Sequence, residues 1–519
     1  MLDLFTPSAT PLGPEHRGTV QLVAWAGVGL LLLALARVSA RFSRVENADD
    51  FLLMGRGVGF WLFFGAYTGA AIGGASIAGF TGMGFDEGIS SFWILLVSGF
   101  TVPLFAWLFG GALNRFGREQ SAFTLSDFLV RRYGPAVQRP AMFITYLRPA
   151  FITGLQFLAI GTLLRVGFGL STSAGVLLGA AIVLGYTVVG GQYSAITSQW
   201  IQSLLQGLGM LLFLICAVAL HGGVVPAGEA MVTHLPDAFR DVYSADFSWM
   251  SVWLISMGVF YFVDPWLFQW AYMAKDPKTS RNALVAASVA SPWGAVSFIG
   301  GMLLAAAMLG GTLELPTDID PDLVYLTFVQ DHLSLGWAAL LLVAYLMTVL
   351  SCASSFLMNG ATILKSDLLD SLVGQDTVKA RPVLMGRIAI IVTAAFGVVA
   401  ALWVPVLVPL WIIGQSIAVS GLFWPVMAAW FWPGATGKGA LASMTVGGIT
   451  SFIWALWAWH SQGSASSLIM GLHAAHVGMA TSLVALIAGS LMTDANPDES
   501  PNATSWKRLN AAAEAEVNA

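Results

Sequence analysis

The stretch Thr348–Asp367, TVLSCASSFLMNGATILKSD, carries a row of polar side chains on an otherwise apolar helix. It follows the run WAALLLVAYLM, which is as apolar as the interior of a lipid bilayer. At 3.6 residues per turn, polar residues spaced three or four apart share one face of a helix. The residues on this face are Thr348, Ser351, Ser355, Asn359 and Thr362. A polar stripe in such a helix needs a polar surface to face.

The composition of the whole chain is that of a membrane protein. Of its 519 residues, 57% are hydrophobic and only 10% are charged, against about 25% charged residues in soluble domains. Runs of roughly 20 apolar residues can span a bilayer, and we count about thirteen. We therefore expect an all-α polytopic membrane protein with spans near 19–37, 57–84, 91–112, 140–166, 172–190, 196–221, 248–273, 283–310, 334–364, 386–403, 408–432, 439–460 and 466–492.

Basic residues are distributed unevenly between the predicted loops. One side of the membrane receives nearly all of them, in the loops at 37–56, 115–132, 275–281 and 365–387. The other side receives little beyond Arg17 and Arg240. Because cytoplasmic loops carry the excess of Lys and Arg, we predict a protein of the plasma or inner membrane with its N-terminus outside and its C-terminus in the cytoplasm.

Two predicted spans contain residues that interrupt helices. The second span includes GAYTGAAIGGASIAGFTGMG, and the seventh includes FYFVDPWLFQW with Pro265 in the middle. Each Gly costs a helix roughly 1 kcal/mol and each Pro about 3 kcal/mol relative to Ala. The two spans are an odd number of spans apart, so the helix blocks that they open have opposite orientations, as in transporters built from inverted repeats. Alternatively, Gly only allows close packing and Pro only kinks one helix.

Several segments resemble the sodium/solute symporter family, which includes sodium-coupled sugar, proline, sialic acid and monocarboxylate carriers. They extend from about residue 46 to 450 and include ENADDFLLMGRGVGFW, IGGASIAGFTGMGFDEGIS, TLSDFLVRRYG, YTVVGGQYSAITSQWIQ, FQWAYMAKDPKTSRNA and WPGATGKGALASMTVGG. The resemblance implies a LeuT-type core of five plus five helices in inverted repeats, with one extra helix before it and two after it.

This fold divides the chain into seven expected segments. They are an external N-terminal segment at 1–18, an extra helix and cytoplasmic loop at 19–56, the first repeat at 57–221, an external loop at 222–247, the second repeat at 248–432, two C-terminal helices at 433–492 and a cytoplasmic tail at 493–519. The tail is polar, and we predict that it is disordered.

The resemblance also answers what the polar stripe faces. In this family, sodium binds between carbonyls of the first core helix and hydroxyls of the eighth. By position, the carbonyls are those of Gly69, Ile72 and Thr348, and the hydroxyl is that of Ser351. The family usually has a second Ser or Thr next, where this chain has Cys352, and a thiol is a poor ligand for a hard cation. Either Thr348 or Ser355 substitutes, or the site is weaker. Alternatively, the hydroxyls only hold helices together.

A second departure from the family concerns the number of coupled ions. Many members carry an Asp after a Ser or Thr in the fifth core helix, and this chain has Gln199 after Ser198. Because Gln199 is neutral, we do not expect an extra ion beside Ser354 and Ser355. We predict one coupled cation.

Asp264 is the only acidic residue deep within a predicted span. An ionisable group in a bilayer costs at least about 2.5–3.5 kcal/mol, so such residues are functional candidates. Three roles remain open: contact with a cationic or hydroxylated substrate, proton transfer, and an ion pair with Arg148. Because a lone carboxylate in hydrocarbon would be neutralised, and Pro265 breaks the helix beside it, we predict that Asp264 lines the central cavity.

Other residues are candidates for the lining of a central cavity. Trp266 stands where sugar-transporting relatives place an aromatic gate, although it could also be a packing residue. Positional carry-over adds the polar or aromatic residues Ser76, Trp93, Gln415, Ser416 and Ser420.

These observations together predict a secondary active transporter. No nucleophile constellation, phosphate loop or metal-binding spacing is present, so we do not expect an enzyme. We expect sodium-coupled symport of a small polar organic solute, such as a sugar, amino acid, carboxylate or betaine, by alternating access. The alternatives are a proton-coupled symporter using Asp264 and a membrane sensor built on a symporter fold. The expected partners are the solute and the lipid bilayer, without nucleic acid, and the protein is expected to be a monomer or weak oligomer.

Overall fold

The chain folds as a bundle of long helices. A computed structural model describes residues 7–42, 44–243, 247–290, 293–373, 380–403, 407–464 and 467–518. Within these residues, eleven helices are long and apolar enough to cross a membrane, or up to twelve when a bent pair is counted as one span. The only β-type pairings among the described residues are two isolated bridges. The predicted all-α polytopic class is confirmed.

The predicted number of about thirteen spans depends on how α8 (Thr172–Ala219) is counted. This helix has 48 residues, and at 1.5 Å per residue it is more than twice as long as the roughly 30 Å hydrocarbon core. At Gly191 the backbone leaves the helical region, with φ 56° and ψ −137°. A Cβ atom at this position would collide with the carbonyl oxygen of Phe51. The spans predicted at 172–190 and 196–221 are therefore the two halves of α8.

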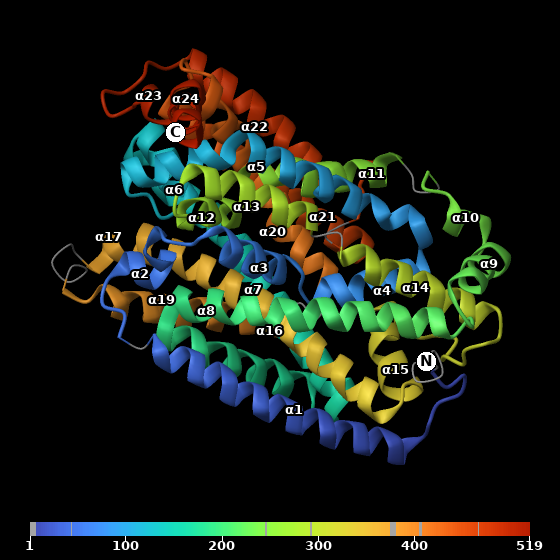
Figure 1. The fold of residues 1–519 in the computed structure, drawn as a ribbon. Coiled ribbons are helices and arrows are strands. Elements are labelled where there is room, and N and C mark those ends of the chain that lie inside the picture. The colour runs from blue at the N-terminus through green and yellow to red at the C-terminus, as the bar shows by residue number, and fades with distance from the viewer. Residues whose placement is uncertain are drawn as a thin grey trace.

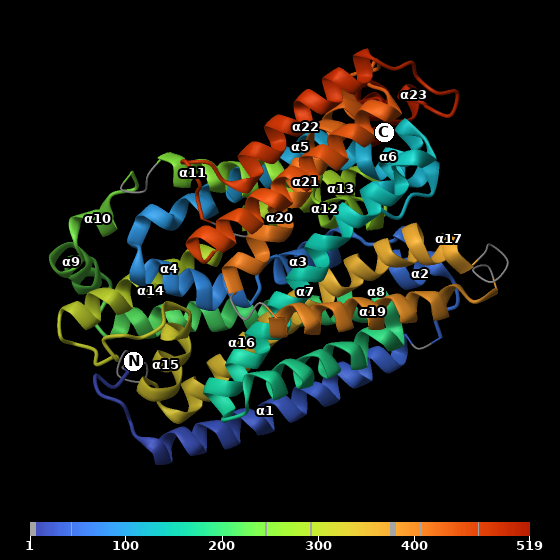
Figure 2. The same ribbon diagram turned by 180° about the vertical axis from the view of Figure 1, so that it is seen from behind.

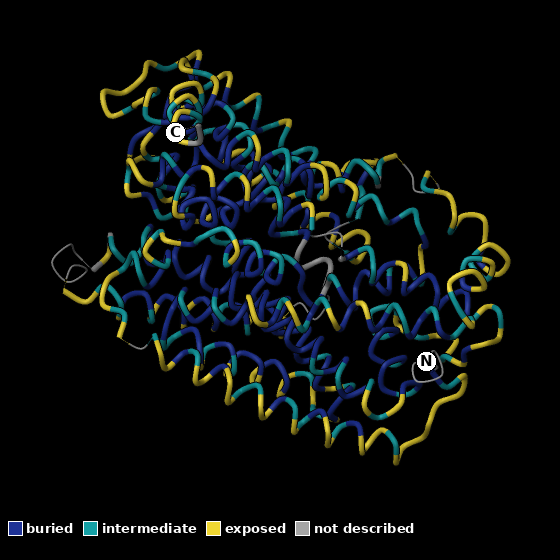
Figure 3. The backbone as a smooth tube through the Cα atoms, viewed as in Figure 1, coloured by how far each residue is buried: buried dark blue, intermediate teal, exposed yellow. Residues whose placement is uncertain are grey.

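The most buried of the long helices is α16 (Leu335–Ile363), which packs mainly on α8 and on α7 (Gln138–Phe168) (Figures 1 and 3). On one edge of the molecule lies α1 (Pro14–Arg41), and α21 (Gly437–Gln462) and α22 (Ala474–Leu491) lie on the opposite edge (Figures 1 and 2). The other long helices are α5 (Trp93–Gln120), α7 (Gln138–Phe168), α13 (Pro277–Ala290), α14 (Trp293–Leu309), α16 (Leu335–Ile363), α19 (Pro382–Trp403) and α20 (Leu407–Phe431). The last predicted span began at residue 466, which lies outside the described residues.

Both predicted helix breaks are present. Helix α3 (Phe60–Ala71) ends at Ile72, whose backbone is extended, and the chain turns by 63° before it continues through a π-helical turn into α4 (Phe80–Asp86). The second break lies at Asp264, which is also extended and begins α12 (Pro265–Met273). Proline suits this first helical position because its missing N–H would have no helical partner there. Irregular backbone at membrane depth is tolerated where it borders a cavity.

Most of the short helices connect the long ones and lie towards the two ends of the bundle, whereas α11 opens the broken span that continues into α12. They are α2 (Ala48–Leu53), α6 (Leu125–Tyr133), α9 (Val224–His234), α10 (Asp237–Arg240), α11 (Phe247–Trp253), α15 (Val324–His332) and α17 (Asp370–Val373). Two further short helices, α23 (Pro501–Thr504) and α24 (Trp506–Asn518), form the end of the chain. The N- and C-terminal parts of the described chain lie at opposite ends of the bundle (Figure 1).

The C-terminal tail differs from its prediction, because α23 and α24 replace the expected disorder. Helix α24 packs on α5 and α13. The indole N–H of Trp506 donates to the carbonyl of Leu108 at 3.1 Å, and Arg281 pairs with Glu514 at 2.8 Å. A helix of this length is marginal alone in water, so these contacts with the rest of the chain account for its order. Tail composition does not reveal them.

Candidate functional site

A central cavity lies where α3 is broken. Its volume is about 420 Å³, and the helices that border it include α3, α4, α5, α7, α12, α13, α14 and α16. Most of its walls are apolar side chains. Among the described residues that line the cavity, Arg148 of α7 is the only charged one.

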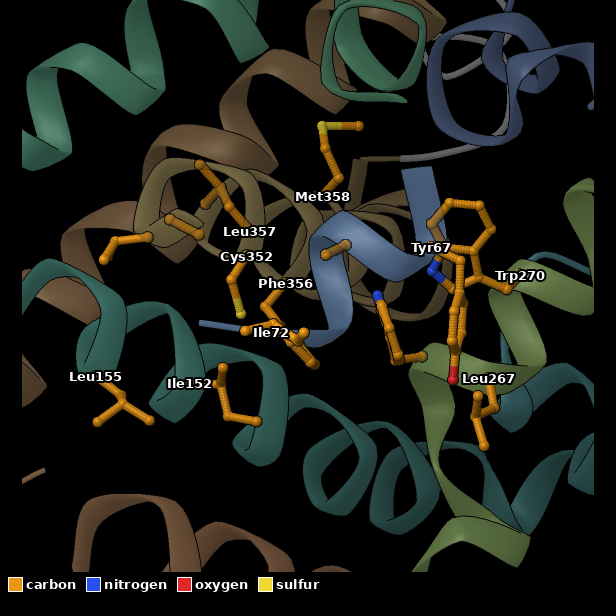
Figure 4. Close-up of a cluster of buried hydrophobic side chains, with 14 of the residues drawn as sticks. Tyr67, Ile72, Ile152, Leu155, Leu267, Trp270, Cys352, Phe356, Leu357 and Met358 are labelled. Carbon is orange, nitrogen blue, oxygen red and sulfur yellow. The ribbon is translucent and has the colours of Figure 1, made fainter. Parts of the chain in front are cut away.

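The structure places four of the predicted site residues in the cavity lining: Ile72, Ser76, Trp266 and Cys352. Figure 4 shows Ile72 beside Cys352 and Phe356, with side chains of α7 facing them. These residues come from α16, α12 and the segment that follows α3. The two helix breaks and the polar stripe therefore meet at one place.

The other predicted lining residues have different partners. Trp93 donates its indole N–H to the carbonyl of Val242 at 2.9 Å. On α20, the Gln415 amide donates to the carbonyl of Ser256 at 2.8 Å, and the Ser416 hydroxyl donates to its own helix. Ser420 packs tightly against Gly478 of α22. None of these four residues borders the described cavity.

An aromatic stack closes one side of the cavity. The ring of Trp266 lies between those of Tyr67 and Phe356, with ring centroids 4.8 and 5.1 Å away. Its indole N–H donates to the Ser355 hydroxyl at 2.8 Å. Tyr67 also contacts Trp270 edge-on, and both appear in Figure 4. The Ser355 hydroxyl thus holds the gate candidate Trp266.

Asp264 forms an ion pair with Arg148, the third of the roles left open by the sequence. Arg148 Nη1 lies 2.8 Å from Asp264 Oδ1, and the same oxygen accepts the backbone N–H of Trp266 at 3.0 Å. The Asp264 side chain is fully buried and, contrary to the prediction, does not border the cavity, because Arg148 lies between its carboxylate and that space. The guanidinium also lies over the rings of Phe260 and Phe356, at 4.6 and 5.0 Å from their centroids. Such contacts favour a cation over an aromatic face.

The predicted sodium ligands include a buried oxygen that lacks a partner. The Ser351 hydroxyl is buried without a hydrogen bond to any described residue, which is unusual unless a bound group completes it. By contrast, the Thr348 hydroxyl donates to the carbonyl of Ala344 at 2.9 Å, which leaves its oxygen lone pairs, as well as its carbonyl, as candidate ligands. A helix that ends also leaves its last carbonyls without intrahelical partners, as at the end of α3. Hydroxyl and carbonyl oxygens are the donors that a hard cation prefers.

Gln199 of α8 links the two sides of this predicted site. Gly69 packs so closely on α8 that a Cβ atom there would lie 2.9 Å from the Gln199 carbonyl oxygen. The Gln199 side-chain amide donates to the Ser354 hydroxyl at 3.1 Å and to the Ser351 carbonyl at 3.4 Å. Gly69 and Ser351 thus approach the same residue from α3 and α16.

Cys352 faces the break in α3. A Cβ atom on Gly73 would lie 2.8 Å from its sulfur. The thiol therefore borders the cavity, and Figure 4 shows it beside Ile72.

Tyr67 and Gln156 are among the residues of the cavity wall that sequence reasoning missed, and it named Arg148 only as a partner for Asp264. Gln156 and Arg148 both lie on α7 and are eight residues apart, with Ile152 midway between them. Residues spaced four apart share one helix face. Arg148 and Gln156 could therefore have been recognised from the sequence, as two polar residues on one face of the predicted span 140–166.

The fold and the cavity define a class of protein: a membrane transporter in which two broken helices meet at a central binding site. A protein-family model described as "Sodium:solute symporter family" matches residues 51–447. The chain belongs to this family. It is therefore a multi-pass membrane transporter that couples sodium to the symport of a small solute, and it is not an enzyme.

Individual relatives agree with this assignment. An osmoregulated proline transporter of Bacillus subtilis is 24% identical over 487 residues, covering 92% of this chain and 95% of that protein. A high-affinity proline transporter of the same organism is 25% identical, covering 80% and 88%. Among solved structures, a substrate-bound, outward-open Na⁺-coupled sialic acid symporter superposes with a TM-score of 0.75 at 19% identity, covering 91% of this chain and 98% of that one. The predicted LeuT-type fold is confirmed by this likeness.

Proposed function

We propose that the solute is an amino acid with a free carboxylate, and that proline is the first candidate. The observation that carries this proposal is Arg148, the only charged side chain among the described residues of the cavity wall. A guanidinium presents several N–H donors in a plane that matches a carboxylate. One Arg148 nitrogen is held by Asp264, so the group is oriented while other N–H donors remain for a ligand.

The remainder of the cavity suits a solute with an apolar body. Its walls include the side chains of Ile72, Ile152, Leu155 and Phe356. A sugar would leave most of its hydroxyl groups without partners against such walls, at a cost of roughly 1–3 kcal/mol for each buried group. A pyrrolidine ring has no such groups on its carbons. The names of the proline-transporting relatives support the same choice.

Sodium and the solute would bind on neighbouring surfaces of the α3 break. We place the sodium at the oxygens of Gly69, Ile72, Thr348 and Ser351, as the sequence predicts. Under the predicted orientation, with the N-terminus outside an inner or plasma membrane, the cavity borders the outer half of α5. The stack of Trp266 and Tyr67 then separates it from the cytoplasm. Proton coupling is less favoured, because Asp264 is paired with Arg148 and does not border the cavity.

The proposal is tested by uptake into proteoliposomes. The purified protein is expected to accumulate labelled proline when sodium is supplied outside, and not when potassium replaces it. A thermal-shift screen against sugars, amino acids, carboxylates and betaines, with and without sodium, provides an independent ranking of solutes. Sodium-dependent stabilisation by a sugar and by no carboxylate-bearing solute would show that the solute class is wrong.

Ser351→Ala is expected to weaken sodium binding. It removes the one hydroxyl in the predicted site that has no other described partner. We expect the sodium concentration for half-maximal uptake to rise by about tenfold, which corresponds to about 1.4 kcal/mol. Ser416→Ala is the matched control, because that hydroxyl is bonded within α20. Unchanged sodium dependence in Ser351→Ala would mean that the site lies elsewhere.

A single sodium ion is expected to accompany each solute. The Gln199 amide places N–H donors against Ser354 and the Ser351 carbonyl, and a donor at this position repels a second cation. The initial uptake rate against sodium concentration should therefore give a Hill coefficient near one. A coefficient near two, or two charges moved per zwitterionic solute, contradicts this prediction.

A further inference from the structure

Gln156 of α7 contacts both the broken helix and the cavity. Its side-chain oxygen Oε1 accepts the backbone N–H of Gly74 at 2.9 Å. This N–H belongs to the segment between α3 and α4, where the helical hydrogen-bond ladder is interrupted. Because an N–H can only donate, the amide must turn its oxygen towards Gly74. The orientation of the whole Gln156 amide is thereby fixed.

The fixed orientation determines where the other end of the amide lies. Gln156 lines the cavity, and its Nε2 makes no hydrogen bond within the described part of the chain. The amide lies directly against Gly73, where a Cβ atom would be 2.7 Å from Oε1 and 2.8 Å from Nε2. Any side chain at residue 73 would displace it. The close approach of Gly73 therefore places a free N–H₂ donor at the wall of the cavity.

We propose that Gln156 joins the solute site to the sodium site through a single side chain. Its Nε2 donates to an acceptor oxygen of the solute, which under the function proposed above is a carboxylate oxygen. Its Oε1 holds Gly74 and so positions the broken segment that includes the Ile72 carbonyl, a predicted sodium ligand. Gln156 thus binds the solute through Nε2 and positions a predicted sodium ligand through Oε1.

This arrangement provides a physical basis for coupling between the two sites. Sodium bound at the carbonyls of the break would restrict the segment at Ile72 and Gly74, and with it the Gln156 amide. A solute held by Nε2 would restrict the same amide from the other side. Binding of either sodium or the solute therefore lowers the conformational-entropy cost of binding the other. By thermodynamic linkage, each raises the binding affinity of the other by the same factor.

Two substitutions separate the two roles of the amide. Gln156→Glu retains an oxygen that can accept from Gly74 but loses the N–H₂ donor and introduces a charge that repels a carboxylate. Gln156→Leu has a similar size and loses both functions. Gln330→Leu is the matched control, because it removes a fully buried glutamine from α15, which does not border the cavity.

The measurements use the purified full-length protein in detergent. Sodium binding is measured without solute, from the thermal midpoint against sodium chloride with choline chloride as the ionic-strength control. Solute binding is measured with labelled proline at saturating sodium. For Gln156→Glu we expect sodium binding within about threefold of native and solute binding weakened by about tenfold or more. For Gln156→Leu we expect both to be weakened, and for Gln330→Leu neither.

Either half of the proposal can fail separately. Native sodium affinity in Gln156→Leu overturns the positioning role, and native proline affinity in Gln156→Glu overturns the donor role. If the native protein binds no carboxylate-bearing solute, the proposed function fails and the donor role fails with it. The sodium titration requires no solute, so it still decides the positioning role.

Discussion

Asp264→Asn is expected to destabilise the protein strongly, whereas adding Arg148→Gln to the same chain should restore most of the stability but none of the transport. The ion pair of these residues is buried, with 0% of the Asp264 side chain exposed. Removing one partner leaves an uncompensated buried charge, which costs about 3–5 kcal/mol. The double variant removes both charges and retains side chains able to hydrogen-bond.

Thermal unfolding and sodium-driven proline uptake are measured on both single variants and the double variant. Arg148 borders the cavity and is the proposed carboxylate partner, so uptake should remain below about 1% of native even where stability returns. Near-native uptake in the double variant would show that the pair is structural and that the solute is held elsewhere. If Asp264→Asn alone is stable and loses only the pH dependence of uptake, Asp264 transfers a proton.

The sequence predicted the helix breaks because their causes are local. Pro265 cannot continue a helix from Asp264, and the glycines of the second span weaken the helix from within. The polar stripe of α16 was also predictable, because a spacing of three or four residues can be recognised within a single helix. From these two features the position of the cavity followed, and Ile72, Trp266 and Cys352 all line it.

Features that depend on how helices rotate against one another were not predictable in the same way. Gln415 and Ser416 of α20 are polar residues in an apolar span, as Ser351 is, yet they bond to Ser256 and to their own helix. The sequence indicates that a buried polar side chain needs a hydrogen-bond partner, but it does not indicate which neighbouring residue supplies that partner. The same limit explains why Arg148 was noticed only as an ion-pair partner and Gln156 not at all.

The C-terminal tail shows a related limit. Its polar composition predicts disorder for a free chain, but Trp506 and Glu514 have partners on α5 and α13. Those partners are more than 200 residues away in the sequence. Local composition therefore cannot predict contacts between residues this far apart in the sequence.

Gly73→Val is expected to reduce sodium-coupled uptake by at least about a hundredfold while the protein still folds. Residue 73 lies in the break of α3, and even a Cβ atom there would be 2.7 Å from Gln156 Oε1 and 2.8 Å from Cys352 sulfur. Contacts this short force the neighbours apart, and overpacking typically costs 1–3 kcal/mol. Much of this strain would be relieved by displacing the Gln156 amide and the segment at Ile72, which changes the geometry of both the solute and the sodium sites.

Gly99→Val provides the matched control, because Gly99 also lines the cavity but has open space where its Cβ atom would be. It should fold and retain sodium binding, with at most a reduced solute affinity from the smaller cavity. Gly73→Val should instead lose sodium binding in the absence of solute, since the carbonyls at the break are displaced. If both variants bind sodium as the native protein does, the geometry of the α3 break does not determine the sodium site. The predicted ligands Gly69 and Ile72 would then have to be abandoned, whatever happens to solute uptake.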